Sequence, residues 1–295
     1  MKKALLLPAL IVSVLVINSC DKIEDPYPES SNPQVDTSGS NNFTAPDLET
    51  LKRRILIEDY TGHTCGNCPS AAIIATGLKT TYGDQVRILG VHAGFFAEPY
   101  GSGNEFRTDF RTASGEEWNT DFGVTGNPKG MVSRQEYGSV VVLDPSAWGS
   151  AASILIDDEP LFDIQMEIDY DSSNKTFTVD VGTYVVNNIS GNYNLVVCVV
   201  EDSIVDWQVD YSLPSADQYV EDYLHEHVLR DNVNGTYGSA LITGSELAET
   251  WLVQSYNYTL DSEWNVDHCS VLAFVADATT KELLQVEDIY ITDSH

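Results

Sequence analysis

The sequence has little positive charge. Its 15 Lys and Arg residues stand against 45 Asp and Glu residues, which gives a formal net charge of −30 at pH 7. A surface this acidic repels nucleic acid and anionic lipid headgroups, and it argues against a phosphate-rich ligand. We therefore expect no nucleic-acid partner, and we attribute most of the acidity to solubility.

Long apolar runs are also absent, with one short exception at the N-terminus. Residues Ala4–Ile17 are predominantly apolar and follow Lys2 and Lys3. The run is shorter than the ~20 residues that a membrane-spanning helix needs. A short apolar run behind two positive charges is typical of a secretory signal peptide, so the sequence predicts export from the cytoplasm.

The end of this run, Ile17-Asn18-Ser19-Cys20, resembles a bacterial lipobox. The resemblance implies that residues 1–20 are a lipoprotein signal peptide and that a lipid on Cys20 anchors the chain in the outer membrane, on its periplasmic or surface face. The alternative is an ordinary secretory signal with a chance cysteine. Residues 21–46 are rich in Pro, Ser, Asn and acidic side chains, which predicts a disordered tether.

Cysteine is scarce, and two of the five cysteines stand together as Cys65-Gly66-Asn67-Cys68. An apolar run of strand character, Ile55–Ile57, precedes them. Apolar residues at three- and four-residue spacing follow over 71–82, and this spacing predicts a helix that begins near the cysteine pair. The sulfur of Cys65 is then expected at a helix N-terminus, where the partial positive charge favours the thiolate.

This order of strand, turn, cysteine pair and helix resembles the active site of the thioredoxin-like fold, although Thr64 stands where that family usually has tryptophan. The resemblance implies that Cys65 attacks a substrate, that Cys68 resolves the mixed disulfide, and that a buried acid moves the proton. Asp59 is the candidate acid, with Glu58 as the alternative, because the sequence does not fix which strand face is inside. Pro128 matches the family's cis-proline, which shapes the substrate groove.

The other elements expected in residues 47–157 complete an α/β thioredoxin-like domain. They are a strand at 85–91, helices near 105–112 and 116–122, strands at 131–134 and 139–143, and a closing helix at 145–156.

From residue 158 onward, apolar and polar residues alternate, as in half-buried strands. Strands are expected at 162–168, 177–186, 195–200, 250–260, 269–276 and 283–291, separated by turn signals. This spacing predicts that residues 158–295 form an all-β, immunoglobulin-like sandwich domain.

Taken together, these segments resemble the outer-membrane lipoprotein family of about twenty-eight kilodaltons. The matching stretches are Glu58–Pro69, Asn127–Arg134, Tyr223–Arg230 and the strands from Cys269 onward. The resemblance implies the envelope location and the two-part fold, and it carries no settled reaction.

The remaining cysteines and the histidines leave alternatives open. Cys198 and Cys269 form a structural disulfide or are two small buried apolar side chains. His225 and His227 lack a third ligand at a fixed spacing, and His63 lies beside the cysteine pair in a redox-like setting. We therefore predict no metal site and no cofactor.

Two functions remain. The first is thiol–disulfide exchange at Cys65 and Cys68 with cysteine-containing envelope proteins. The second is a non-enzymatic surface lipoprotein that binds another ligand, in which Cys65–Cys68 is a permanent structural disulfide.

Overall fold

The protein is described from a computed structural model, which covers residues 42–100, 103 and 105–292. The expected signal peptide, the lipidated Cys20 and the tether up to residue 41 lie outside the described residues. In the described part of the chain, no helix combines the length and the apolar character that a membrane span requires.

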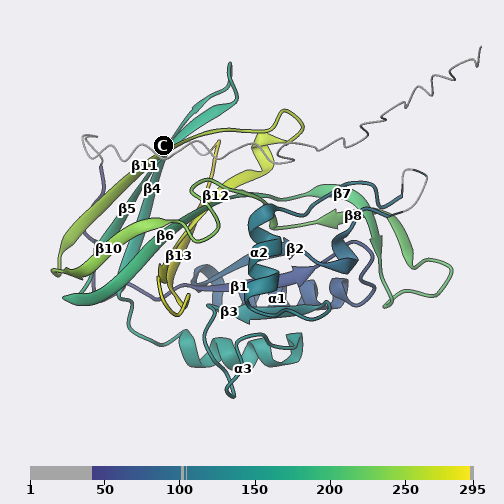
Figure 1. Cartoon of the computed structure of the whole chain (residues 1–295), viewed down its shortest axis with the longest axis horizontal. Helices are drawn as coiled ribbons and strands as arrows, with labels where there is room; N and C mark the ends of the chain where they lie inside the picture. Colours follow the sequence, from purple (N-terminus) through teal and green to yellow (C-terminus); the bar gives the residue numbers. More distant parts are fainter. Residues whose placement is uncertain (1–41, 101–102, 104, 293–295) are drawn as a thin grey trace, which may run out of the picture.

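The centre of the molecule is an eight-stranded sheet in the order β13-β12-β6-β9-β2-β1-β3, with β10 also paired to β6 (Figure 1). Its strands are β1 (Ile55–Thr61), β2 (Val86–His92), β3 (Lys129–Val132), β6 (Ile189–Glu201), β9 (Val228–Asn232), β10 (Ser239–Glu246), β12 (Cys269–Asp277) and β13 (Leu283–Tyr290). Strand β1 is parallel to β2 and antiparallel to β3.

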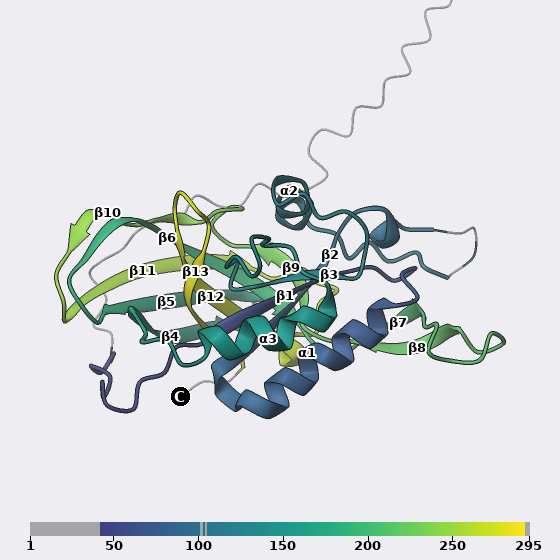
Figure 2. The same ribbon diagram turned by 90° about the horizontal axis from the view of Figure 1, so that it is seen from below.

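Helices cover both faces of the β1–β3 region (Figure 2). Helices α1 (Cys68–Tyr82) and α3 (Pro145–Leu155) lie on one face, and α2 (Ala113–Asp121) lies on the other. Alternate residues of β1 point to opposite sides. Ile55 and Ile57 pack in the core with α1 and α3, whereas Leu56 and Tyr60 pack in the core that contains Trp118 of α2. The apolar run of β1 is thus buried on both faces.

A second, three-stranded sheet faces the far end of the large sheet. Its strands are β4 (Phe162–Asp171), β5 (Thr176–Val185) and β11 (Thr250–Thr259), in the order β11-β5-β4. One apolar core fills the space between these strands and the facing side chains of β6 and β12. The period-two alternation read from the sequence is the reason for this arrangement, since it places every second side chain in that core.

Strands β7 (Ile204–Val209) and β8 (Tyr219–His225) form a separate two-stranded sheet, called the β7–β8 hairpin below. Figure 1 shows it beside the end of the large sheet that carries β1 and β2. Three short 3₁₀ helices complete the described secondary structure: η1 (Gly83–Gln85), η2 (Phe95–Ala97) and η3 (Val266–His268).

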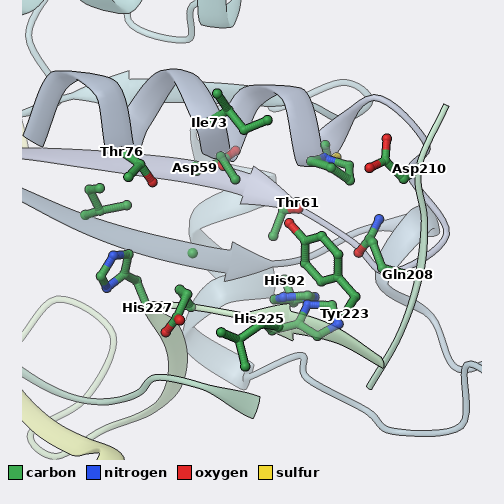
Figure 3. Close-up of a pocket in the computed structure, with 17 residues that line it drawn as sticks. Asp59, Thr61, Ile73, Thr76, His92, Gln208, Asp210, Tyr223, His225 and His227 are labelled. Atoms are coloured by element: carbon green, nitrogen blue, oxygen red, sulfur yellow. The ribbon is translucent and has the colours of Figure 1, made fainter. Parts of the chain in front are cut away.

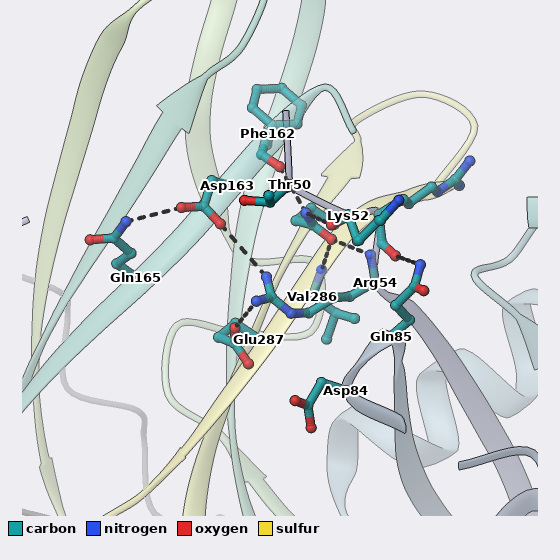
Figure 4. Close-up of polar contacts among 12 residues, drawn as sticks. Thr50, Lys52, Arg54, Asp84, Gln85, Phe162, Asp163, Gln165, Val286 and Glu287 are labelled. Atoms are coloured by element: carbon teal, nitrogen blue, oxygen red, sulfur yellow. Dashed lines mark hydrogen bonds and ion pairs between the residues drawn. The ribbon is translucent and has the colours of Figure 1, made fainter. Parts of the chain in front are cut away.

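A polar network joins β1, β4 and β13 where the two sheets meet (Figure 4). The buried Gln285 side chain accepts a hydrogen bond from the Arg54 backbone N–H at 2.7 Å and donates to the Phe162 carbonyl at 2.8 Å. The Arg54 guanidinium contacts Asp163 at 3.6 Å and Glu287 at 3.2 Å. Buried polar groups with several partners fix the geometry of the region that they join.

The large sheet takes strands from both of the segments that the sequence suggests as domains. Strand β2 pairs with β9 through Gly90 and Val228, and β9 pairs with β6. The division at residues 157 and 158 remains a prediction, but the two segments share one sheet.

Two expected elements are wrong. Residues 105–112 form no helix, because Phe106 has a positive φ of 53° and its side chain is buried with Phe110 against histidine rings. Residues 139–143 make only isolated bridges, in a segment where Gly138 and Ser139 also have positive φ. The other expected strands and helices are confirmed within a few residues at each end, except that β6 begins at Ile189 rather than at residue 195.

Candidate functional site

Cys65 and Cys68 form a disulfide with an S–S distance of 2.11 Å. Cys68 is the first residue of α1, Pro69 lies in its first turn, and no side chain caps the helix. The helix N-terminus therefore leaves backbone N–H groups near the disulfide. Each cysteine is only 2% exposed.

The loop that carries Cys65 is held down by the β7–β8 hairpin. The Gln208 side chain donates to the Cys65 carbonyl at 3.0 Å, and the Val209 N–H donates to the His63 carbonyl at 2.9 Å. The Tyr211 N–H donates to the Gly66 carbonyl at 2.8 Å. These bonds extend the hairpin across the loop like an added strand.

Glycine at position 66 is required by this packing. A Cβ atom there would lie 2.4 Å from the ring of Tyr211. The aromatic ring thus rests directly on the backbone between the two cysteines. On the other side of the loop, the Phe96 carbonyl accepts hydrogen bonds from the Thr64 N–H at 3.1 Å and the Thr64 hydroxyl at 2.9 Å. Both contacts close off the Cys65 end of the disulfide.

A cavity of about 340 Å³ opens on the other end of the disulfide (Figure 3). Cys68 lines this cavity, whereas Cys65 is not among its lining residues. Figure 3 shows Asp59 on the α1 side and Tyr223, His92 and His225 on the opposite side. Most of the wall is apolar, so the few polar groups stand out as candidates for chemistry.

Asp59 is the acid on the cysteine side of β1. Its side chain is 4% exposed, and burial raises its pKa to about 7. Within the described residues, no hydrogen-bond partner reaches its Oδ1. A buried carboxyl without a partner destabilises the fold when it is ionised, which is a frequent property of acid–base residues.

Glu58 lies on the opposite face of the strand and is fully satisfied. Arg134 donates to its two carboxylate oxygens at 2.9 and 2.7 Å, and both side chains are completely buried. The guanidinium also stacks on Trp118 and Phe274, at 4.7 and 5.4 Å from the ring centroids. Strand alternation therefore places Asp59, and not Glu58, in the cavity that Cys68 lines.

The buried histidines near the cavity are held neutral. Burial lowers the pKa of His225 to about 4 and also lowers the pKa of His92. Their ring centroids are 5.6 Å apart, and Phe110 packs against both rings. His63 contacts the Glu98 carbonyl at 3.0 Å. Among the described residues, no group of three His, Cys, Asp or Glu side chains is arranged to hold a metal ion.

The Asn127–Pro128 bond is cis, as the resemblance implied. The Asn127 side chain donates to the Thr61 and Ala93 carbonyls at 2.8 and 3.2 Å, and Lys129 pairs with Tyr60. Pro128 is thereby fixed beside the end of β1 from which the cysteine loop departs.

Cys198 and Cys269 are free thiols, so of the two alternatives left open by the sequence the disulfide is wrong. Cys198 lies opposite Leu272 in the β6–β12 ladder, and Cys269 lies opposite Glu201. Their side chains also enter different cores on opposite faces of the sheet. Burial raises the pKa of both thiols, that of Cys269 to about 12, so both behave as small apolar side chains.

Sequence reasoning missed the residues of the β7–β8 hairpin that hold the cysteine loop, above all Gln208 and Tyr211. Nothing in the local pattern links residues 208–211 with the cysteines. The segment from Tyr223 to His227 carried the only signal, as a histidine-rich stretch. It forms the wall of the cavity opposite α1.

A second cavity of about 490 Å³ lies between α2 and the segment that follows β11. Its wall is more polar and includes Arg111, Arg230, Asp231 and Trp264, and none of its lining residues belongs to the first cavity.

The family of outer membrane protein Omp28 matches residues 115–294, which is more than half of the chain. The chain belongs to the Omp28 family. This membership supports an outer-membrane location. The matched region begins after Cys68, so the Omp28 assignment does not bear on the chemistry of the disulfide.

Comparison with solved structures gives HBP35 of Porphyromonas gingivalis, with a TM-score of 0.61 and 16% identity over 83% of this chain and 77% of that one. This likeness concerns the fold alone. A domain of the outer membrane lipoprotein Omp28 from the same organism matches 47% of this chain and 93% of its own, with 17% identity and a TM-score of only 0.31. Comparison with curated proteins gives no match.

Proposed function

We propose that the Cys65–Cys68 disulfide exchanges with cysteine thiols of other proteins in the cell envelope. The observation that carries this proposal is the position of Asp59, which is buried, lacks a partner at Oδ1 and shares a cavity with Cys68. With a pKa of about 7, its carboxyl gains or loses a proton near neutral pH. A disulfide with only a structural role does not require a proton donor or acceptor beside it.

The surrounding elements support the same function. Parallel strands β1 and β2 are joined by α1, the cysteine pair begins that helix, and β3 follows a cis-proline beside β1. This order resembles a thioredoxin-like active site and so supports the proposal. In this proposal the helix N-terminus favours a cysteine thiolate, and Pro128 borders the groove for the substrate strand.

The reduction potential of the Cys65–Cys68 pair tests this function. The protein is equilibrated in buffers of defined redox poise, and the disulfide fraction is measured by alkylation and mass spectrometry. We expect a potential above about −300 mV, in the range of exchange catalysts. The Asp59→Asn variant should retain the disulfide but exchange about tenfold or more slowly at pH 7, since general acid–base catalysis contributes at least that much.

A second function is favoured by one specific observation, the nearly complete burial of both cysteines under the β7–β8 hairpin. In this alternative the disulfide is permanent, and the protein binds an envelope ligand, for which the second cavity is the candidate site. A potential below about −300 mV would select this function. Ligand binding that survives replacement of both cysteines by serine would support it further.

We also propose that Cys20 carries the lipid that holds the protein in the outer membrane, and that the two facing sheets of the second half are an immunoglobulin-like sandwich. The lipobox-like Ile17-Asn18-Ser19-Cys20 supports the anchor. Cys20→Ser should move the protein from the membrane fraction to the soluble fraction. Retention of the variant in the membrane fraction would rule the anchor out.

A further inference from the structure

The geometry points to Cys68 as the sulfur that a substrate thiol attacks, and to thiols without negative charge as the molecules that enter the cavity. This inference rests on the proposed exchange function. It differs from the expectation drawn from the sequence, in which Cys65 meets the substrate. The shared chemistry is a thiol on a slender, neutral or cationic group, either a small molecule or a cysteine in an extended peptide.

Access is the first argument. Four hydrogen bonds close the Cys65 loop: its carbonyls accept from the Gln208 side chain and from the Val209 and Tyr211 N–H groups, and the Thr64 N–H donates to the Phe96 carbonyl. Cys68 lines the cavity, and the apolar side chains of Pro69, Ala72 and Ile73 continue its wall along α1. Ile73 is 70% exposed, so this wall leads outward to solvent. A volume of about 340 Å³ admits a small thiol or one side chain with its neighbours, and it excludes a folded protein.

Charge is the second argument. The carboxylates of Asp59, Asp210 and Glu226 line the cavity, and none of the described lining residues is Lys or Arg. His92 and His225 also face it, and burial lowers the pKa of both, so they are neutral at pH 7. The remaining titratable groups of the wall are Tyr223 and His227, and His227 is paired with Asp202 at 2.9 Å. This field repels an anionic thiol and attracts a cationic one.

Proton transfer is the third argument, because the acid lies on the same side as Cys68. The incoming thiol gives its proton to the Asp59 carboxylate. Its sulfur bonds to the Sγ of Cys68, the Cys65–Cys68 bond breaks, and the electron pair of that bond stays on Cys65 as a thiolate next to the N-terminus of α1. The sulfur of a second thiol molecule then bonds to the substrate sulfur of the mixed disulfide, the bond to Cys68 breaks, and its electron pair stays on Cys68. The proton of the second thiol goes to the Cys65 thiolate, and the proton held by Asp59 goes to the Cys68 thiolate. Two thiols become one small disulfide, and the protein disulfide becomes two thiols.

Single-cysteine variants test which sulfur is accessible. Cys65→Ser leaves the Cys68 thiol, and Cys68→Ser leaves the Cys65 thiol. Each folded variant is treated with the neutral disulfide 4,4′-dithiodipyridine, and its rate is divided by the rate of the same variant in urea. The double variant measures the background from the other cysteines, and near-ultraviolet circular dichroism checks the fold. We expect Cys65→Ser to react about tenfold faster or more.

The unaltered protein provides the second measurement, which does not depend on the folding of a variant. Its disulfide is treated with cysteamine, 2-mercaptoethanol or 3-mercaptopropionate, or with neutral and acidic cysteine peptides. Each rate is divided by the rate of the same thiol with a small reference disulfide. We expect cysteamine to exceed 3-mercaptopropionate about fivefold at low salt, with a smaller ratio at high salt. Rapid alkylation and mass spectrometry should find the mixed disulfide on Cys68.

The outcomes separate this inference from the function on which it rests. A mixed disulfide on Cys65, or faster reaction of Cys68→Ser, would overturn the inference while exchange itself stands. Equal normalised rates for cationic and anionic thiols would overturn its charge component. A disulfide that resists every thiol in the folded protein would overturn both the inference and the proposed exchange. A response to peptides alone would identify polypeptides as the source of the thiol.

Discussion

Two neighbouring carboxyl groups of β1, those of Glu58 and Asp59, point to opposite faces of the sheet and have opposite surroundings. On the α2 side, Glu58 is paired with Arg134 through two hydrogen bonds and enclosed by aromatic rings. On the α1 side, Asp59 is equally buried, but its Oδ1 has no partner in the described part of the chain, and a cavity lies beside it. The difference separates a charge that the fold satisfies from one that it leaves available for proton transfer.

The largest expected effect on stability comes from removing the buried ion pair between Arg134 and Glu58. Arg134→Met removes the cation and leaves Glu58 buried without a partner, which should lower the free energy of unfolding by about 3–5 kcal/mol. The measurement is urea unfolding at pH 7. Arg54→Met is the matched control, because that guanidinium is partly exposed and its ion pairs are longer, so its loss should be well below that of Arg134. Equal losses of unfolding free energy in the two variants would show that burial does not make the Arg134–Glu58 pair more important for stability than the partly exposed pairs of Arg54.

Asp59→Asn tests the carboxyl group on the α1 face of β1, through the pH dependence of stability. The folded-state pKa of about 7 lies above the ordinary aspartate value of 3.8, because the side chain is buried, so the folded protein holds this proton more tightly than the unfolded chain. Stability therefore falls as the pH rises from about 4 to about 7, by up to about 4 kcal/mol. The variant lacks this loss, and it should be more stable than the natural protein at pH 8 and similar to it at pH 4.

The check is the difference in unfolding free energy between the two proteins across this pH range. Taking the difference removes the contributions of the buried histidines, which change stability in the opposite direction because their pKa is lowered. A difference that does not change with pH would show that Asp59 titrates normally. The two faces of β1 would then not differ in the way described.

The contrast between the faces also shows how far the sequence could predict this site. The cysteine pair, its helix, the cis-proline and the two candidate acids, Glu58 and Asp59, all follow from local pattern and resemblance. The side on which each acid points depends on which helix covers which face, and no local pattern contains that information. The same limit applies to Cys198 and Cys269, whose positions on opposite faces follow from the register of β6 and β12.

The sequence pattern did not predict the two strands of the β7–β8 hairpin, for a different reason. Strand prediction depends on alternating burial, but Val205 is 62% exposed and Leu224 is 47% exposed. The hairpin is held instead by hydrogen bonds to the cysteine loop from the Val209 and Tyr211 backbone and from the Gln208 side chain, and these leave no alternating pattern in the sequence. The helix expected at 105–112 is wrong for the opposite reason. Phe106 and Phe110 are buried, as the pattern suggested, but they are buried by contacts with histidine rings and not on one face of a helix.

The smallest expected effect tests how tightly the hairpin closes the Asp59 side of β1. Gly66→Ala places a methyl group against the Tyr211 ring, and overpacking of this kind costs about 1–3 kcal/mol. In a Tyr211→Ala background the same change should cost clearly less, because the atoms that would clash are ring atoms. Gly77→Ala is the matched control, since nothing lies within 4 Å of its added methyl and helix propensity favours alanine. Unfolding of the natural protein, the two single variants at positions 66 and 211 and the double variant gives the coupling energy between these positions. A coupling near zero would mean that the Tyr211 ring does not pack tightly against the backbone of the cysteine loop.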